Sequence, residues 1–287
     1  MLTFLRFARL HTLIGTSLSI TALYLMAARA GDQQDWRILA LTLLACLAAN
    51  VYITGLNQIT DVDIDRINKP YLPIASGDYS MGKAKRIVFF CLGLALVGGL
   101  FGGRYLLSTI LISILIGTAY SVPPIRLKRH PFWAAFCILA VRGLVVNILL
   151  YLHFDYSLNE QERLPAEVQI LTIIIFGFSL IIAWFKDLPD TQGDAAFGVR
   201  TLSISWGRKQ VWLVGSCFIG LGLLASAVYL IWALDETALG YGQFGLLVAY
   251  LVMASRVDLE QQSSIAQFYQ GFWVLFFAEY VLFGLLG

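Results

Sequence analysis

The sequence predicts an all-α fold, a multi-pass transmembrane bundle of about nine helices that forms a single domain over residues 1–287. The composition indicates a lipid environment, because 59% of the 287 residues are hydrophobic and only 13% are charged, against about 25% in soluble domains. Apolar stretches of roughly 18 to 22 residues, long enough to cross a ~30 Å hydrocarbon core, recur along the whole chain. A lipid bilayer is therefore the expected partner, and the net charge of +2 gives no sign of a nucleic-acid partner.

The expected spans follow one another along the chain. They are residues 10–29, 38–57, 86–103, 105–121, 132–152, 168–186, 210–233, 239–255 and 266–286. The first stretch is too long for a signal h-region and no cleavage-like site follows it, so we interpret it as a span. Only nine residues precede it, which leaves no room for an organelle transit peptide. A prokaryotic plasma or thylakoid membrane is the expected location.

Basic residues are distributed unevenly between the two sides of the predicted bundle. Of the 20 Lys and Arg residues, 15 fall in connections on the N-terminal side and four on the other, while Arg142 falls inside a span. Lys and Arg concentrate in cytoplasmic connections. The N-terminus and the connections after even-numbered spans should therefore be cytoplasmic.

The first polar segment of interest follows the second span. Asn57, Asp61 and Asp65 are spaced four residues apart, so on a continuous helix they lie within about 80° of one another. Asp63 would point the other way. The helix should end near Asn68, because the proline that follows restricts the residue before it. This segment is predicted to present two carboxylates and one amide on one helix face.

The second polar segment lies at the end of the sixth span. Lys186 and Asp187 begin it, and Asp190 and Asp194 again stand four residues apart. Pro189 should kink the backbone and loosens the argument that Asp187 shares their face. Because connections after even-numbered spans share one side, both polar segments are expected on the cytoplasmic side.

Grouped carboxylates at a membrane boundary repel one another unless a cation is present. Mg²⁺ prefers oxygen ligands and is usually shared between one or two carboxylates and the phosphates of a substrate. We therefore expect Asp61, Asp65, Asp190 and Asp194 to hold Mg²⁺ and a diphosphate, with neighbouring Lys and Arg on the remaining phosphate oxygens. The alternative is that these residues are ordinary solvated charges in interfacial loops.

These motifs resemble those of a known family. The pattern Asn57-xxx-Asp61-xxx-Asp65 with Asn68-Lys69-Pro70 is similar to the first signature of UbiA-type intramembrane prenyltransferases, and Lys186-Asp187-xx-Asp190-xxx-Asp194 is similar to the second. Segments around His11, Tyr120, Arg142 and Trp273 more closely resemble the homogentisate phytyltransferases of tocopherol synthesis. One departure is Leu10, which stands where that family has proline.

The resemblance implies a UbiA-like fold and Mg²⁺-dependent transfer of a prenyl group, expected to be phytyl, from its diphosphate to homogentisate with loss of CO₂. Alternatives within the superfamily are homogentisate geranylgeranyl- or solanesyltransferases and prenyltransferases of chlorophyll, quinone or ether-lipid synthesis. An alternative from another class is a secondary transporter. Transporters place ionisable groups near the bilayer midplane, whereas these carboxylates are predicted at helix ends.

Further polar residues are candidates for binding the prenyl diphosphate or the small aromatic acid. By resemblance, Lys128 and Arg126 would meet the diphosphate, although they could also serve only to orient the chain in the membrane. The full predicted set of substrate-binding residues is His11, Asn57, Arg66, Lys69, Tyr120, Arg126, Lys128, Arg142, Asn147, Lys186 and Asp187.

Arg142 differs from the other candidates because it is predicted near the middle of the fifth span. An Arg at the centre of a membrane helix costs roughly 2.5 to 3.5 kcal/mol on insertion scales, which makes it a functional candidate. It could face the carboxylate of an aromatic acid, or it could pair with Glu279 of the ninth span. The sequence leaves both possibilities open.

Overall fold

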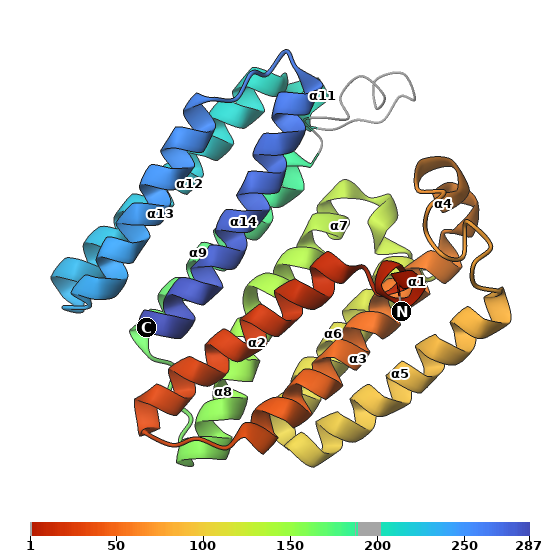
Figure 1. The fold of residues 1–287 in the computed structure, drawn as a ribbon, viewed down its shortest axis with the longest axis horizontal. Coiled ribbons are helices and arrows are strands. Elements are labelled where there is room, and N and C mark those ends of the chain that lie inside the picture. Colours follow the sequence, from red (N-terminus) through yellow and green to blue (C-terminus); the bar gives the residue numbers. More distant parts are fainter. Residues whose placement is uncertain (1, 187, 189–201) are drawn as a thin grey trace. The chain divides into compact units, whose positions relative to one another are not determined.

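The computed structural model describes residues 2–186, 188 and 202–287 (Figure 1). The described chain is helical, with no strand among those residues. It divides into two compact units, one formed by Met1–Cys137 with Val145–Arg163 and the other by Ile138–Leu144 with Leu164–Gly287. We call them unit 1 and unit 2. The prediction of one domain for the whole chain stays a prediction.

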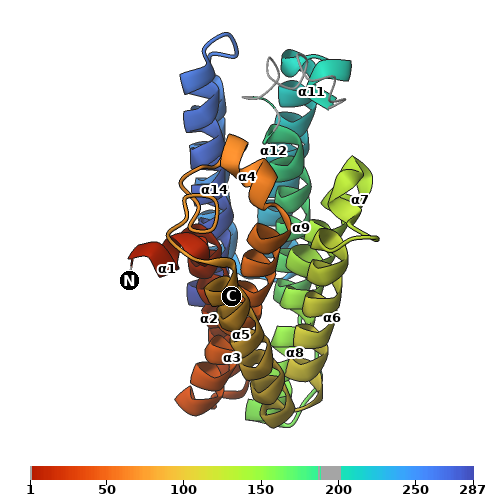
Figure 2. The same cartoon turned by 90° about the vertical axis from the view of Figure 1, so that its right-hand side faces the viewer.

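Unit 1 is built around α3, which packs against α2, α5 and α6 (Figures 1 and 2). Small residues bring α3 and α5 close together, since a Cβ placed on Gly98 would lie 2.7 Å from the Cβ of Ala45. Such small-residue contacts are typical of helix packing in membranes. The elements of unit 1 are α1 Leu2–Phe7, α2 Leu10–Gly31, α3 Trp36–Thr60, α4 Val62–Asn68, α5 Met81–Gly102, α6 Arg104–Ser121, the 3₁₀ turn Leu127–Arg129, α7 Pro131–Ile138, whose last residue groups with unit 2, and α8 Val146–Asn159.

Unit 2 is a group of long helices in which α9 packs against α12 and α14, and α13 packs against α12 and α14. Its core is aromatic: the Phe272 ring lies 4.9 Å from that of Phe178 and 5.3 Å from that of Phe185, measured between centroids. Tilted and edge-to-face rings of this kind stabilise a core beyond their buried area. The elements of unit 2 are α9 Ala166–Phe185, α11 Leu202–Ser205, α12 Arg208–Ala233, α13 Thr237–Ser255 and α14 Gln262–Leu286.

Within the described residues, nine helical segments are long and apolar enough to cross a membrane. They coincide with the nine expected spans, so the predicted fold class, a multi-pass helical membrane protein, is confirmed. The fifth segment, Phe132–Asn159, is not uniform, because α7 and α8 are joined by a π-helical stretch over Leu139–Val145. Stretches of π-helix inside α-helices occur often at functional sites.

The first polar segment departs from the continuous helix predicted from its spacing. The helix breaks at Asp61, whose φ of −115° and ψ of 14° lie outside the helical region, so α3 ends at Thr60 and α4 begins at Val62. Many active-site residues occupy this sparsely populated region of backbone space. The predicted end at Asn68 is confirmed. The break gives Asp61 a position between two helices and not on a helix face.

Candidate active site

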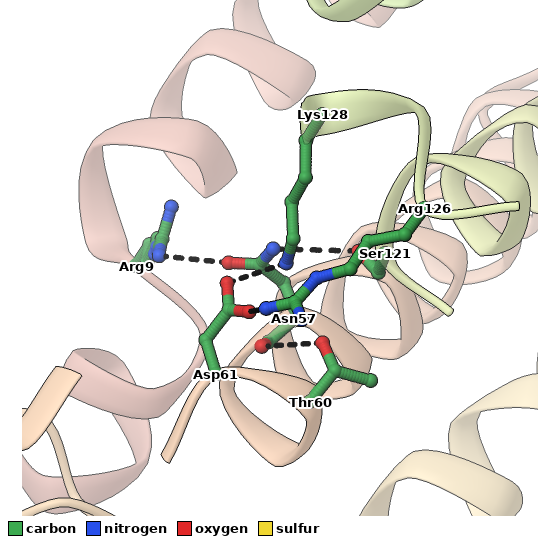
Figure 3. A network of polar contacts seen from close by, with 7 residues as sticks. All are labelled: Arg9, Asn57, Thr60, Asp61, Ser121, Arg126 and Lys128. Atoms are coloured by element: carbon green, nitrogen blue, oxygen red, sulfur yellow. Dashed lines mark hydrogen bonds and ion pairs between the residues drawn. The ribbon is translucent and has the colours of Figure 1, made fainter. Parts of the chain in front are cut away.

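The site is built first on the last turn of α3, where Asn57 joins two distant segments. Its Oδ1 accepts a hydrogen bond from Arg9 Nη2 at 3.2 Å, and its Nδ2 donates one to Ser121 Oγ at 3.3 Å (Figure 3). Arg9 precedes α2 and Ser121 ends α6. The amide of Asn57 therefore ties the beginning of one span to the end of another.

Asp61 lies at the centre of the same network and faces two cations. Arg126 Nη2 donates to Oδ1 at 2.7 Å, and Lys128 Nζ donates to Oδ2 at 2.5 Å (Figure 3). The three side chains are only 12 to 17% exposed. Charge-assisted hydrogen bonds between shielded partners are about twice as strong as neutral ones. Both oxygens of Asp61 are thus occupied by basic residues of the loop after α6.

Two of the arginines in this network have an unusual backbone conformation. Arg9 has a φ of 54° and Arg126 a φ of 37°, both in the left-handed region. This region costs an L-residue roughly 1 to 2 kcal/mol, and such strain persists where the surroundings enforce it, often at functional sites. The backbone is therefore strained at the two residues whose guanidinium groups contact Asn57 and Asp61. The turn at Arg9 leads directly into Leu10, the residue that departs from the family pattern.

Asp65 and Asp63 occupy contrasting surroundings on the short helix α4. Asp65 is buried, with 6% of its surface exposed, and its Oδ2 has no hydrogen-bond partner. The side chain of Asp63 is 94% exposed, as predicted, and forms an ion pair with Arg66 at 3.1 Å. Arg66 is therefore placed with the exposed carboxylate, and the structure does not bring it to Asp61.

The electrostatics of the site follow from this burial. Burial raises the pKa of the Asp65 carboxyl above its usual value, while the charges of Lys69 and Arg9 act in the opposite direction. Burial also lowers the pKa of the Lys128 ammonium, and its hydrogen bond to Asp61 opposes that shift. A buried carboxylate with an unpartnered oxygen is a suitable ligand for a hard cation such as Mg²⁺. Asp65 therefore fits a metal-binding role on geometric grounds.

Other predicted residues gather around a neighbouring pocket of about 390 Å³. Lys69 and His11 line it together with Arg9 and Arg6, and its remaining walls are leucine and tyrosine side chains. Tyr120 lies near Lys128, whose Nζ is 5.9 Å from the Tyr120 ring centroid. Unit 1 thus concentrates positive charge around Asn57 and Asp61.

In unit 2, Arg142 is half-buried within the π-helical stretch and lies over two aromatic rings. Its guanidinium carbon is 5.1 Å from the ring centroid of Trp273 and 5.5 Å from that of Phe276. The Oε1 of Glu279 accepts a hydrogen bond from Gln243 at 3.4 Å, and its Oε2 takes none. The alternative in which Arg142 pairs with Glu279 is therefore wrong, and cation–π contacts are what the structure provides.

The remaining predicted residues fall in three places. Asn147 is fully buried on α8 and belongs to unit 1, whereas Arg142 groups with unit 2. Lys186 is exposed just after α9. The rest of the second motif, Asp187, Asp190 and Asp194, lies outside the described residues. Among those described, no group of three His, Cys, Asp or Glu side chains forms a metal-type cluster.

Sequence reasoning did not assign Arg9 or Ser121 to the site. Arg9 stands 48 residues before Asn57, and Ser121 stands 64 residues after it. No spacing rule connects such positions. The available signal was the proximity of each to a segment already singled out, Arg9 beside His11 and Ser121 beside Tyr120.

Comparison with known proteins identifies a family. The profile of the UbiA prenyltransferase family matches residues 18–278. The chain is 45% identical to the homogentisate phytyltransferase of Synechocystis sp., over 98% of this chain and 94% of that protein. It is 34% identical to the homogentisate geranylgeranyltransferase of Hordeum vulgare, over 98% and 71%. It is 36% identical to the homogentisate solanesyltransferase of Arabidopsis thaliana, over 98% and 75%.

Solved structures show the same fold at low sequence identity. A structure of digeranylgeranylglyceryl phosphate synthase superposes with a TM-score of 0.71 at 21% identity, covering 99% of this chain and 97% of that one. A UbiA homolog from Archaeoglobus fulgidus bound to GPP and Mg²⁺ gives a TM-score of 0.67 at 16% identity, covering 97% and 99%. These likenesses support the fold independently of the sequence match.

Proposed function

The chain belongs to the UbiA prenyltransferase family, and from that premise we propose that it transfers a phytyl group from its diphosphate to homogentisate, with loss of CO₂, in tocopherol or prenylquinone synthesis. The observation that carries the proposal is the network in which Arg126, Lys128 and Arg9 converge on Asp61 and Asn57. The names of the relatives support the choice of acceptor.

The diphosphate would bind to the cations that Asp61 now holds. Arg126 presents a planar guanidinium that suits phosphate oxygens, and Lys128 acts as a point charge. A diphosphate carries more negative charge than one carboxylate, so it competes for both cations. Asp61 then serves to keep these two side chains in place until the substrate arrives.

Mg²⁺ would be held by Asp65 and Asp61 together with Asp190 and Asp194 of the second motif. The unpartnered buried oxygen of Asp65 is the feature of this chain that fits such an ion. The UbiA homolog from Archaeoglobus fulgidus bound to GPP and Mg²⁺ supports the same use. When bound, the ion neutralises negative charge on the diphosphate and makes it a better leaving group.

In the transfer, the C–O bond between the prenyl chain and the diphosphate breaks, and its electron pair leaves with the diphosphate. Arg126 and Lys128 stabilise the charge that develops on the leaving oxygen. The electron-rich ring of homogentisate forms the new C–C bond and releases one proton. Its carboxymethyl group loses CO₂ and takes up one proton to become methyl. Exclusion of water from the site prevents capture of the allylic cation as an alcohol.

Arg142 is the proposed partner of the acceptor carboxylate. It lies in a π-helical stretch, which turns side chains away from the regular helical positions, and it is placed over the rings of Trp273 and Phe276. A guanidinium presents its N–H donors in a planar fork that matches the two oxygens of a carboxylate. This geometry suits a small aromatic acid better than a neutral ring.

Different observations bear on the alternative functions, which are transport and transfer of another prenyl group. A secondary transporter is ruled out, because the chain belongs to a family of prenyltransferases. Geranylgeranyl and solanesyl transfer remain second candidates, because those relatives are also 34 to 36% identical to the chain. Phytyl transfer is preferred because identity rises to 45% with the phytyltransferase.

The function is tested by giving the purified enzyme homogentisate with phytyl, geranylgeranyl or solanesyl diphosphate and identifying the products by mass. We expect the highest kcat/KM with phytyl diphosphate, release of CO₂, loss of activity in EDTA and its return with added Mg²⁺. Prenylation of another ring but not of homogentisate would show that the acceptor is wrong. Preference for a longer diphosphate would show that the chain length is wrong.

We also propose that the diphosphate site faces the cytoplasm, as the distribution of Lys and Arg predicts. Ile67 of α4 is 83% exposed, and Gln161, between α8 and α9, is exposed as well. In a variant without its four native cysteines, Ile67→Cys should be labelled by an impermeant thiol reagent from the cytoplasmic side and Gln161→Cys from the opposite side. The reverse pattern would place the site on the other face.

A further inference from the structure

A groove with a volume of about 510 Å³ runs between α9 and α12 in unit 2. Ile170, Ile173 and Phe218 are among the apolar residues that line it. Ile173 is 71% exposed and Phe218 is 49% exposed, so the groove opens sideways from two membrane-spanning helices. Its volume falls in the range of roughly 300 to 1,000 Å³ that is typical of small-molecule sites.

A glycine keeps the groove open. A Cβ placed on Gly222 would meet no atom within 4 Å, so the missing side chain is replaced by open space. On the facing helix, a Cβ on Gly177 would lie 3.2 Å from the ring of Phe218. Gly222 is exposed, so this space belongs to the open side of the groove. The space at Gly222 can hold part of a ligand.

The groove is polar at one end and apolar at the other. Gln169 lies near the start of α9 and Tyr229 near the end of α12, so in this antiparallel pair they share one end. Ser226 adds a hydroxyl to the same end and accepts a hydrogen bond from Gln243 at 3.1 Å. All three are neutral groups, and none of the residues that line the groove is Lys, Arg, Asp or Glu.

From this arrangement we propose that the groove binds a neutral prenylated phenol, with its hydroxylated ring between Gln169 and Tyr229 and its isoprenoid tail along Ile173, Phe218 and Gly222. The neutral lining excludes selection of a diphosphate or an anionic lipid headgroup, which would need basic partners. The inference rests on the proposed function, since a prenylated hydroquinone is the product of that reaction. The site would retain the product at the protein surface before it enters the bilayer.

The test uses a phytylated hydroquinone with a photoreactive group on its tail, bound to the full-length protein in phosphatidylcholine nanodiscs. Gly222→Leu fills the open space and should weaken binding about tenfold, because added methylenes compete with the tail. Gly220→Leu is the matched control, since it lies on the same helix, also meets no atom within 4 Å and does not line the groove. We expect it to bind like the unmodified protein, and crosslinks to map to α9 and α12.

Equal weakening by the two leucine variants, or crosslinks confined to other helices, would overturn the proposal. Displacement of the probe by an anionic phospholipid would show that the groove is a lipid-headgroup site and would overturn it too. Should Gly222→Leu give too little folded protein, Gly222→Ala, whose Cβ meets nothing, should bind less tightly than Gly220→Ala. Binding is measured in EDTA without diphosphate, so its outcome is independent of whether homogentisate is the acceptor.

Discussion

The two units treat buried polar groups in opposite ways. In unit 1, Asp61 is held at 2.5 to 2.7 Å by two cations that come from a distant loop. In unit 2, Arg142 rests on aromatic rings, and Glu279 meets one neutral amide at 3.4 Å. Cations that are paired with a carboxylate can exchange that partner for a negatively charged ligand. Among the described residues, the ion-paired cations that suit a diphosphate therefore lie in unit 1, while in unit 2 Arg142 lies over aromatic rings and Glu279 meets an amide.

A second contrast lies within unit 1, between Asp61 and Asp65. Both carboxylates are shielded, but Asp61 has two direct cationic partners and Asp65 has an oxygen with none. Removing the charge of Asp61 should therefore leave two unpaired cations, whereas removing that of Asp65 should relieve the cost of burying a carboxylate whose Oδ2 has no hydrogen bond. The two substitutions should separate stability from activity.

The largest effect is expected for Asp61→Asn. Arg126 and Lys128 would lose their shared counter-ion while only 13 to 17% exposed, and breaking a buried pair costs about 3 to 5 kcal/mol. The free energy of unfolding, measured by denaturant titration in detergent, should fall by about 3 kcal/mol or more. Activity should be lost as well.

A double variant provides the control for that result. Asp61→Asn combined with Lys128→Met removes one of the two unpaired charges, so it should recover part of the stability without recovering transfer. A single Asp61→Asn protein that is as stable as the unmodified enzyme would contradict the ion-pair account. It would also remove the contrast between the two units.

The second effect, on activity, is expected for Asp65→Asn. Loss of a preorganised electrostatic group typically lowers kcat by about 10²- to 10³-fold, and here it would remove an oxygen proposed to bind Mg²⁺. Stability measured in EDTA should be unchanged or higher, because burial of the charge is no longer required. The apparent affinity for Mg²⁺, from the dependence of rate on its concentration, should fall as well.

Asp63→Asn is the matched control on the same short helix. Its side chain is 94% exposed and pairs with Arg66, and exposed pairs contribute about 1 kcal/mol or less. Transfer should therefore stay close to that of the unmodified enzyme. Equal loss at Asp63 and Asp65 would contradict the division of α4 into a buried and an exposed carboxylate.

The third effect concerns acceptor binding in unit 2. Arg142→Gln should raise KM for homogentisate about 10- to 150-fold, the equivalent of a charge-assisted hydrogen bond worth roughly 1.5 to 3 kcal/mol. KM for phytyl diphosphate should change little, which is the mark of lost acceptor binding. Arg142→Lys keeps the charge and should recover part of the affinity. A lower protein yield with unchanged KM would assign Arg142 a structural role.

The fold could be predicted from the sequence because hydrophobic length determines which helices can span a bilayer. The end of α4 was predictable for a local reason too, since the proline after Lys69 restricts the chain. The break at Asp61 was not, because its partners lie 65 and 67 residues further along the chain. The π-helical stretch at Leu139–Val145 could not be predicted either. A largely apolar span has no hydrophobic periodicity from which a change of helix type could be detected.

For the site, spacing identified the carboxylates of the first motif but not their individual surroundings. The four-residue repeat treats Asp61 and Asp65 as equivalent on one helix face, whereas the structure pairs one and leaves an oxygen of the other unpartnered. Likewise, the sequence placed Arg142 inside the fifth span, and its charge suggested Glu279 as a partner. In the structure, α14 brings the rings of Trp273 and Phe276 to Arg142. Tertiary packing, which the sequence does not display, decides such choices.

The smallest effect is expected for Glu279→Gln, which tests whether unit 2 depends on charge. Glu279 is fully buried, with one neutral donor at 3.4 Å, so the hydrogen bond and not the charge should link α14 to α13. Hydrogen bonds between membrane helices average about 0.6 kcal/mol, and the glutamine amide can replace this one. The unfolding free energy should therefore change by less than about 1 kcal/mol, while Glu279→Leu should cost more because the hydrogen bond from Gln243 to α14 is lost and Gln243 keeps only Ser226 as acceptor. If Glu279→Gln destabilises the protein as much as Asp61→Asn, both units depend on charge, and the contrast between them is wrong.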